Sequence, residues 1–364
     1  MFFYFANISS WLNKKYCTLS KDFYKTKNMN KNFWLNRAEE WPICALAPMD
    51  GYTDSPYRQV VKEIAPNTVV FSEFYSADGL VHSKELQKKA LTHNQKEYPL
   101  IIQIFWKDPE KFRDAAQIIE SYGITWIDIN MGCPAKKVVK SGHGSSLMIQ
   151  RETAFKIVEE MSKAVSIPIS VKTRLGWENH ELLIDFCKWL QDAWANLVTV
   201  HWRTYKQAFT GQANFEWIYE LKKHLNIPVI CNGDILNYDD GIKKMNNLDG
   251  FMIGRASFGN PWCFLPWDYT PTLTEIIQTI KKHGDLLWEM KWKKWMLEAR
   301  KHLVQYLHSF PWVKEYRTNL VHVESPEEIH DILNRIEKEH SELLNMRIKS
   351  STKESYETAW WCEC

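Results

Sequence analysis

The residues best suited to chemistry lie in one stretch, residues 127–147, which reads IDINMGCPAKKVVKSGHGSSL. An apolar run stops there at Asn130, and Cys133 follows in the loop before a new helix. Three lysines come soon after it: Lys136, Lys137 and Lys140. A thiol at a strand end beside several cations is suited to chemistry on an anionic partner. The alternative is a cysteine that serves as a small core residue, which is the commoner case for an isolated cysteine.

Short apolar runs and helical segments alternate along most of the chain. The apolar runs are residues 43–49, 68–74, 99–105, 125–130, 168–172, 197–201, 228–232 and 250–254. Segments with helical periodicity lie between them, among others at residues 108–122, 151–165, 180–195 and 215–225. Eight strands that alternate with helices predict an α/β fold with a parallel sheet, and the count of eight favours a (β/α)8 TIM barrel. An open, doubly wound sheet is the alternative, but no GxGxxG motif follows the first run.

Polar residues and glycines gather at the ends of seven of these expected strands. In a (β/α)8 barrel the active site lies at the carboxyl ends of the strands, so these residues would meet at one rim. The candidates are Pro48, Met49, Asp50, Gln103, Asn130, Cys133, Lys172, Arg174, His201, Arg203, Asn232, Gly233, Asp234, Gly254 and Arg255. Packing alone does not require polar groups at seven strand ends, and we therefore expect a functional site there.

The last two strand ends indicate what this site binds. Residues 232–234 and 254–255 offer backbone N–H groups and a guanidinium in the place where barrels commonly hold a phosphate. Lys172 and His201 are suited to contact an electron-rich ring, and Gln103 offers an amide donor and acceptor to the edge of a heterocycle. These residues predict a phosphorylated heterocyclic cofactor that lies across the barrel mouth.

Composition places the chain among globular proteins. Its 364 residues are 45% hydrophobic and 25% charged, as expected for a folded core. The net charge of +2 and the pI of about 8.0 require any nucleic-acid surface to be local. The eight cysteines form no CxxC pair, which is typical of reduced thiols in the cytoplasm.

Neither a membrane span nor a metal site is expected from the sequence. No apolar run reaches the roughly 18–20 residues that a membrane span needs. His143 and His201 lack an accompanying set of ligands for a metal ion. We therefore expect a cytoplasmic protein without a metal, and we expect it to be a monomer.

Four regions divide the chain: an N-terminal extension at residues 1–40, the barrel at 41–268, a helical domain at 269–345 and a tail at 346–364. The helical domain is expected to hold helices at residues 273–288, 291–308, 314–321 and 326–344. Residues 290–317 carry seven basic residues against two acidic ones. Such a run forms either a solvated helix face or a surface that contacts a phosphate backbone.

Seven short motifs together resemble one protein family. They are APMDGYTDSPYR at residues 47–58, SEF at 72–74, DINMGCPAKKVVKSGHGSSL at 128–147, VKTRLGW at 171–177, HxRT at 201–204, NGDI at 232–235 and MIGRASFGNPW at 252–262. Their types and order resemble the tRNA-dihydrouridine synthase family across residues 42–265. The basic helical segment that follows is similar to that family's C-terminal tRNA-binding domain.

This resemblance implies a flavin enzyme. The FMN-binding residues would be Pro48, Met49, Asp50, Gln103, Lys172, His201, Asn232, Gly233, Asp234, Gly254 and Arg255. NADPH (or NADH) would reduce the flavin, which passes a hydride to C6 of a uracil in tRNA. Cys133 would be the general acid that protonates C5, and a thiol with an ordinary pKa of about 8.5 still carries its proton at pH 7.

The same resemblance implies contacts with tRNA. Asn130, Arg174 and Arg203 would hold the uridine, which must leave its stack at a cost of a few kcal/mol. Lys136, Lys140 and residues 290–317 would contact backbone phosphates. Two alternatives stay open: an FMN barrel of the dihydroorotate-dehydrogenase type that acts on a small molecule, and a tRNA-binding protein without flavin. The basic helical domain argues against the first, because a small substrate needs no such surface.

Several tryptophans stand where the family pattern has glycine. The clearest are Trp106, Trp126, Trp194 and Trp202, and further cases are Trp267, Trp292, Trp295 and Trp312. The chain has 14 glycines, fewer than its 18 tryptophans, whereas about 7% glycine is usual. We hypothesise that UGA codons read as glycine by the organism have been translated as tryptophan. The alternative is true divergence, in which an indole at position 202 intrudes beside the flavin.

Overall fold

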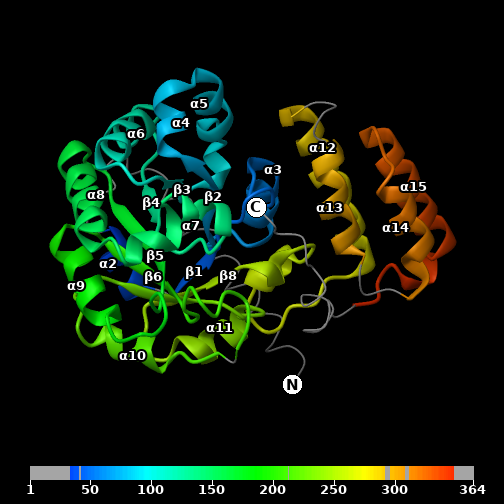
Figure 1. Ribbon diagram of the computed structural model, residues 1–364. Helices are drawn as coiled ribbons and strands as arrows, with labels where there is room; N and C mark the ends of the chain where they lie inside the picture. Colours follow the sequence, from blue (N-terminus) through cyan, green and yellow to red (C-terminus); the bar gives the residue numbers. More distant parts are fainter. Residues whose placement is uncertain (1–32, 41, 212, 292–295, 308–310, 348–364) are drawn as a thin grey trace.

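Eight parallel strands form a closed barrel in the order β1 to β8 (Figure 1). The computed structural model describes residues 33–40, 42–211, 213–291, 296–307 and 311–347. The strands are β1 (Ile43–Leu46), β2 (Val69–Ser76), β3 (Leu100–Phe105), β4 (Ile127–Asn130), β5 (Ile169–Arg174), β6 (Leu197–His201), β7 (Val229–Asn232) and β8 (Gly250–Ile253). The predicted (β/α)8 barrel is confirmed, and β1 closes it by pairing with β8.

Helices follow the strands and cover the outside of the barrel (Figure 1). They are α3 (Ser55–Ile64), α4 (Ala77–His82), α5 (Lys84–Leu91), α6 (Pro109–Ser121), α7 (Lys136–Lys140), α8 (Arg151–Ala164), α9 (Leu183–Asp192), α10 (Glu216–Lys222) and α11 (Tyr238–Met245). Helix α6 begins where Asp108 caps it by accepting a hydrogen bond from the Glu110 N–H. The helices expected at 180–195 and 215–225 are shorter than predicted, and α9 stops before Trp194, whose φ is +78°.

An aromatic cluster fills the amino-terminal end of the barrel. Trp126, which precedes β4, packs against Trp34 at 3.9 Å and Phe33 at 4.4 Å between ring centroids. Phe33 and Trp34 belong to helix α2 (Phe33–Glu40), inside the range expected to be an extension. All three side chains are buried together with residues of six strands. Helix α2 therefore closes the amino-terminal end of the barrel, opposite the carboxyl ends of the strands.

Four helices after the barrel form a second core of their own. They are α12 (Leu273–Lys291), α13 (Met296–Tyr306), α14 (Lys314–Leu320) and α15 (Pro326–Glu339). In Figure 1 they stand beside the barrel next to α3, and Lys282 forms an ion pair with Glu63 of α3. Two predicted bounds were wrong by three residues or more: α12 runs on to Lys291, and α15 ends at Glu339 before a short 3-10 turn. The predicted helix at 291–308 includes residues 292–295 and 308, which lie outside the described residues. Among the described helices, none combines the length and the apolar composition that crossing a membrane requires.

Candidate active site

A chain of hydrogen bonds crosses three neighbouring strands inside the barrel. Asp128 pairs in register with Gln103 of β3 and Ser170 of β5. Its carboxylate accepts from Gln103 Nε2 at 2.7 Å and from Ser170 Oγ at 2.5 Å. Gln103 Oε1 in turn accepts from Asn130 Nδ2 at 2.9 Å. Sequence reasoning missed Asp128, although a charged residue inside an apolar strand was the available signal.

Asn130 also holds the loop that carries Cys133. Its Oδ1 accepts from the backbone N–H of Gly132 at 3.1 Å and of Cys133 at 2.9 Å. Arg174 Nε donates to the Gly132 carbonyl at 2.7 Å, and the Ser145 N–H donates to the Cys133 carbonyl at 3.1 Å. The thiol-bearing loop is thus fixed from β4, from β5 and from the turn that follows it.

Burial keeps the Cys133 thiol protonated at neutral pH. Desolvation raises its pKa above the ordinary value, and Arg174 and Lys172 offset only part of this rise. The described cysteines, Cys133 among them, form no disulfide. A protonated thiol at the rim of a barrel can deliver its proton to a bound substrate.

Lys172 and His201 lie on adjacent strands and are both perturbed by burial. Burial, followed by the neighbouring Arg174, lowers the pKa of Lys172 to about 8. Burial holds the pKa of His201 well below its usual range. Four nearby cations lower this pKa further, and Arg174 has the largest effect among them. The Arg203 N–H donates to His201 Nδ1 at 3.1 Å, so the neutral ring carries its proton on Nε2. His201 therefore presents an N–H donor on the side of Gly233.

Asp234, which follows β7, binds two guanidinium groups from the ends of β6 and β8. Arg203 donates to both carboxylate oxygens, at 3.2 and 2.7 Å, and Arg255 donates at 3.2 Å. Asn232 Nδ2 donates to the Met252 carbonyl at 2.8 Å. Gly233 has a φ of +108°, and a Cβ there would lie 2.9 Å from His201 Nε2, so only glycine fits.

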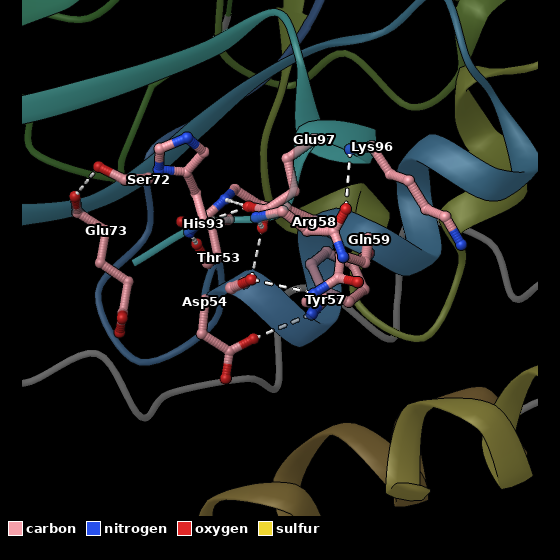
Figure 2. A network of polar contacts seen from close by, with 12 residues as sticks. Thr53, Asp54, Tyr57, Arg58, Gln59, Ser72, Glu73, His93, Lys96 and Glu97 are labelled. Carbon is pink, nitrogen blue, oxygen red and sulfur yellow. Dashed lines mark hydrogen bonds and ion pairs between the residues drawn. The ribbon is translucent and has the colours of Figure 1, made fainter. Parts of the chain in front are cut away.

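A buried polar network supports the rim at the end of β1 (Figure 2). Arg58 of α3 donates to Glu97 at 2.7 Å and to the Thr53 carbonyl at 2.6 Å. Glu73 of β2 accepts from the Gly51 N–H at 2.6 Å. These contacts hold the loop that follows Pro48, Met49 and Asp50, and Met49 Sδ lies 3.7 Å from the position of a Cβ on Gly254. The network ties the loop after β1 to β2, to α3 and to the turn before β3.

A sequence model described as dihydrouridine synthase matches residues 45–342. The chain belongs to the dihydrouridine synthase family. It is 36% identical over 301 residues to probable tRNA-dihydrouridine synthase 1 of Synechocystis sp., which covers 79% of this chain and 84% of that protein. It is 34% identical over 295 residues to the probable tRNA-dihydrouridine synthase of Rickettsia prowazekii, covering 77% and 90%. It is 34% identical over 275 residues to tRNA-dihydrouridine synthase B of Pasteurella multocida, covering 72% and 82%. The family predicted from the seven motifs is confirmed.

Members of the dihydrouridine synthase family are flavin-dependent oxidoreductases, and the site geometry fits such a cofactor. Burial is the main cause of the lowered pKa of His201, and four cations that surround this residue lower it further: Arg174, Lys172, Arg203 and Arg255. A cationic pocket of this kind suits a phosphate and a ring that gains negative charge. The Lys172 ammonium has no hydrogen-bond or ion-pair partner within the described part of the chain, so it is available to a ligand.

Three side chains expected to hold the uridine also have protein partners. Arg174 NH1 donates to the carbonyls of Thr204 and Ala208, at 3.2 and 3.0 Å. Arg203 is paired with Asp234, and Asn130 holds the Cys133 loop. All three are buried. They shape the rim of the pocket, and their contact with a uridine stays a prediction.

The residues expected to contact tRNA phosphates fall into two groups. Lys136 and Lys140 lie exposed on α7, beside the Cys133 loop. Arg300 instead donates to the carbonyls of His322 and Val323, which ties α13 to the end of α14. The Lys301 ammonium lies 4.7 Å from the centroid of the Tyr52 ring, in the loop after β1. Lys293 and Lys294 lie outside the described residues.

Two tryptophans adopt a backbone conformation that favours glycine. Trp194 has a φ of +78° with 66% of its surface exposed, and Trp267 has a φ of +65° with 71% exposed. Trp126 and Trp202 are buried, and their indole N–H groups have no acceptor among the described residues. Trp106 is partly buried and packs on His143 at 4.4 Å between ring centroids.

Two further tryptophans of this set, Trp202 and Trp312, lie against other side chains. The Trp202 indole lies against the candidate cofactor site, because a Cβ on Gly233 would be 2.4 Å from its Cδ1 and 2.6 Å from its Nε1. The hypothesis that this indole intrudes beside the flavin stays a prediction. Trp312 stacks on His340 at 3.8 Å. Trp292 and Trp295 lie outside the described residues. The described chain holds no cluster of three or more His, Cys, Asp or Glu side chains suited to a metal ion.

Proposed function

We propose that this protein reduces a uridine of tRNA to 5,6-dihydrouridine, with FMN as cofactor and NADPH or NADH as reductant. The observation that carries the proposal is a protonated Cys133 on the same barrel rim as the cationic pocket around Lys172 and His201. Its membership in the dihydrouridine synthase family supports the reaction. A flavin-free tRNA-binding protein leaves this combination unexplained, and a small-molecule substrate leaves the basic helical segment at residues 290–317 without a role.

Each group at the rim has a role in holding the cofactor. Gly233, Asp234, Gly254 and Arg255 would bind the FMN phosphate through backbone N–H groups and a guanidinium. Gln103, Lys172 and His201 would face the ring, with the loop of Pro48, Met49 and Asp50 closing over its edge and Asn232 supporting the end of β7. The bound flavin supplies a hydride for C6 of the uracil. Lys172 stabilises the negative charge that the ring carries when reduced.

Cys133 completes the reaction as general acid. Its S–H bond would break while a C5–H bond forms, and the electron pair of the former C5–C6 double bond, displaced onto C5 when the hydride adds at C6, would form this bond. The resulting thiolate is stabilised by Arg174 and Lys172, and it recovers a proton from water. Burial suits this role, because a thiol of raised pKa keeps its proton until charge develops on the carbon.

The uridine reaches this site after leaving its stack in tRNA. Asn130, Arg174 and Arg203 would contact the base. Lys136 and Lys140 would contact backbone phosphates, together with the basic residues of the helical domain. We place the reaction in the cytoplasm, with the protein acting as a monomer.

The decisive experiment measures dihydrouridine in tRNA from a strain that lacks this gene and any paralogue. We expect dihydrouridine to disappear from at least one position and to return with the wild-type gene but not with Cys133→Ala. Cys187→Ala is the matched control, because Cys187 is a buried, unpaired cysteine of α9 far along the chain from the motif. Unchanged dihydrouridine at every position in the deletion strain would refute the proposal.

A further inference from the structure

Asp128 is the last acceptor in a series of hydrogen bonds that all donate in the same direction. The backbone N–H groups of Gly132 and Cys133 donate to Asn130, Asn130 donates to Gln103, and Gln103 donates to Asp128. Asp128 is fully buried, and it also accepts from Ser170. The series links the Cys133 loop to a buried residue of β4.

The direction of every bond in this series follows from chemistry at its two ends. Backbone N–H groups can only donate, so the oxygen of Asn130 faces the loop and its NH2 faces Gln103. An ionised carboxylate can only accept, so the NH2 of Gln103 faces Asp128 and its oxygen faces Asn130. Of the possible amide orientations, this arrangement places a donor opposite an acceptor at every link of the series.

We propose that Asp128 is a positioning residue, which orients the Gln103 amide toward the cofactor and, through Asn130, holds Cys133 in place. This role rests on the function proposed above, in which Gln103 contacts FMN and Cys133 donates a proton. Without an acceptor at position 128, the Gln103 NH2 is a buried donor without a partner, at a cost of about 1–3 kcal/mol. The Gln103 side chain then rotates toward the cofactor site to reach an acceptor, and the hydrogen bond from Asn130 Nδ2 to Gln103 Oε1 is lost.

The reactivity of Cys133 toward iodoacetamide tests this coupling without flavin or tRNA. Alkylation of the Cys133 peptide is followed by mass spectrometry over a range of pH in the flavin-free protein. We expect Asp128→Leu to raise the rate at pH 7 about tenfold, as a fall of one unit in the thiol pKa would do. The affinity for FMN, measured by fluorescence quenching, falls in the same variant.

Two further variants make the result specific. Asp128→Asn keeps an acceptor for Gln103, because its NH2 can turn to Ser170, and it stays within about twofold of the wild-type rate. Asp128 also acts electrostatically on Lys172. If the lost charge were responsible, Asn and Leu would change the rate equally, and the proposal would be overturned. Thr199→Val is the matched control, because Thr199 is a buried polar residue of β6 whose hydroxyl has no partner among the described residues.

The remaining outcomes also decide the question. An Asp128→Leu rate and pH profile equal to those of Thr199→Val would overturn the positioning role. If Asp128→Leu is not recovered folded, Gln103→Leu removes the middle link and must raise the alkylation rate in its place. Since the assay needs no substrate, a failure of the proposed reaction leaves this result intact.

Discussion

Burial shifts the pKa values of three groups of the candidate site toward their neutral forms. The pKa of the Cys133 thiol is raised, that of His201 is lowered, and that of Lys172 falls to about 8. Each shift has desolvation as its largest cause, because the low-dielectric barrel penalises whichever form is charged. The pocket therefore offers a proton on sulfur, a neutral N–H donor and a cation that a small rise in pH removes.

FMN binding should weaken as the pH rises through about 8. Below this pH Lys172 is protonated and attracts the anionic cofactor, and above it the group becomes neutral in the free protein. We expect a progressive loss of affinity between pH 7 and 9 in fluorescence titrations. Lys172→Met should bind FMN more weakly at pH 7 and show a flatter profile. A wild-type affinity that is constant over this range would contradict the assignment.

Glycine at positions 194 and 267 should stabilise the protein. An L-residue in the left-handed region costs roughly 1–2 kcal/mol, and glycine avoids most of this cost. Both indoles are largely exposed, so little burial is lost. We expect Trp194→Gly and Trp267→Gly each to raise the free energy of unfolding by about 1 kcal/mol in urea titrations. Trp194→Ala is the control, because it removes the indole and keeps the Cβ, and it should gain less.

The coding hypothesis makes a separate prediction at the same residues. If UGA is read as glycine, codons 106, 126, 194 and 202 are UGA in the gene, and peptides of the native protein contain glycine there. Sequencing of the gene and mass spectrometry of the native protein measure both. UGG at these codons would establish that the tryptophans are genuine.

The loop between β1 and α3 depends on an ion pair that is closed off from solvent. The side chains of Arg58 and Glu97 are buried, and they link α3 to the turn before β3 (Figure 2). A buried charge left without its partner is strongly destabilising, whereas removal of both charges together costs far less. The Arg58–Glu97 ion pair therefore helps to fix the position of Met49 and Asp50 at the end of β1.

Removing one member of this pair should destabilise the fold severely. We expect Arg58→Leu or Glu97→Leu to lower the free energy of unfolding by about 3–5 kcal/mol, and the double variant to lose less than the two together. Urea denaturation of the four proteins gives the coupling. Lys163→Ala breaks an exposed ion pair with Glu159 and should leave stability unchanged. Additive losses in the double variant would show that the pair is not coupled.

At the scale of the whole molecule, the barrel mouth lies between two basic regions. Helix α7 presents Lys136 and Lys140 on one side, and Lys301 of α13 reaches the loop after β1. The net charge of the chain is only +2, so attraction for tRNA must come from this local arrangement. The helical domain brings one of these basic residues, Lys301, close to the loop after β1.

Loss of Lys136 and Lys140 should weaken tRNA binding and leave FMN binding unchanged. If each lysine contacts one phosphate, the double alanine variant reduces the slope of log Kd against log salt by about 0.7–0.9 per contact. Filter binding at several salt concentrations measures the slope. Lys163→Ala is again a suitable control, since that lysine is exposed and already paired. An unchanged slope would remove α7 from the tRNA surface.

The sequence by itself determined the barrel, the family and the rim residues, because these depend on local patterns. Strand and helix periodicity are properties of short segments, and Cys133, Lys172 and His201 stand at strand ends that any parallel barrel brings together. The expected helix end at residue 344 was less accurate, because helix ends depend on caps and on packing against other elements, and α15 ends at Glu339.

Only the tertiary structure decided which polar groups face one another. Asp128 meets Gln103 from 25 residues away in sequence, and Arg203 meets Asp234 from 31. No local pattern encodes these pairings, because they arise when barrel closure sets the register of neighbouring strands. The same closure buries Cys133, Lys172 and His201 and so shifts their pKa values, which gives the rim its chemistry.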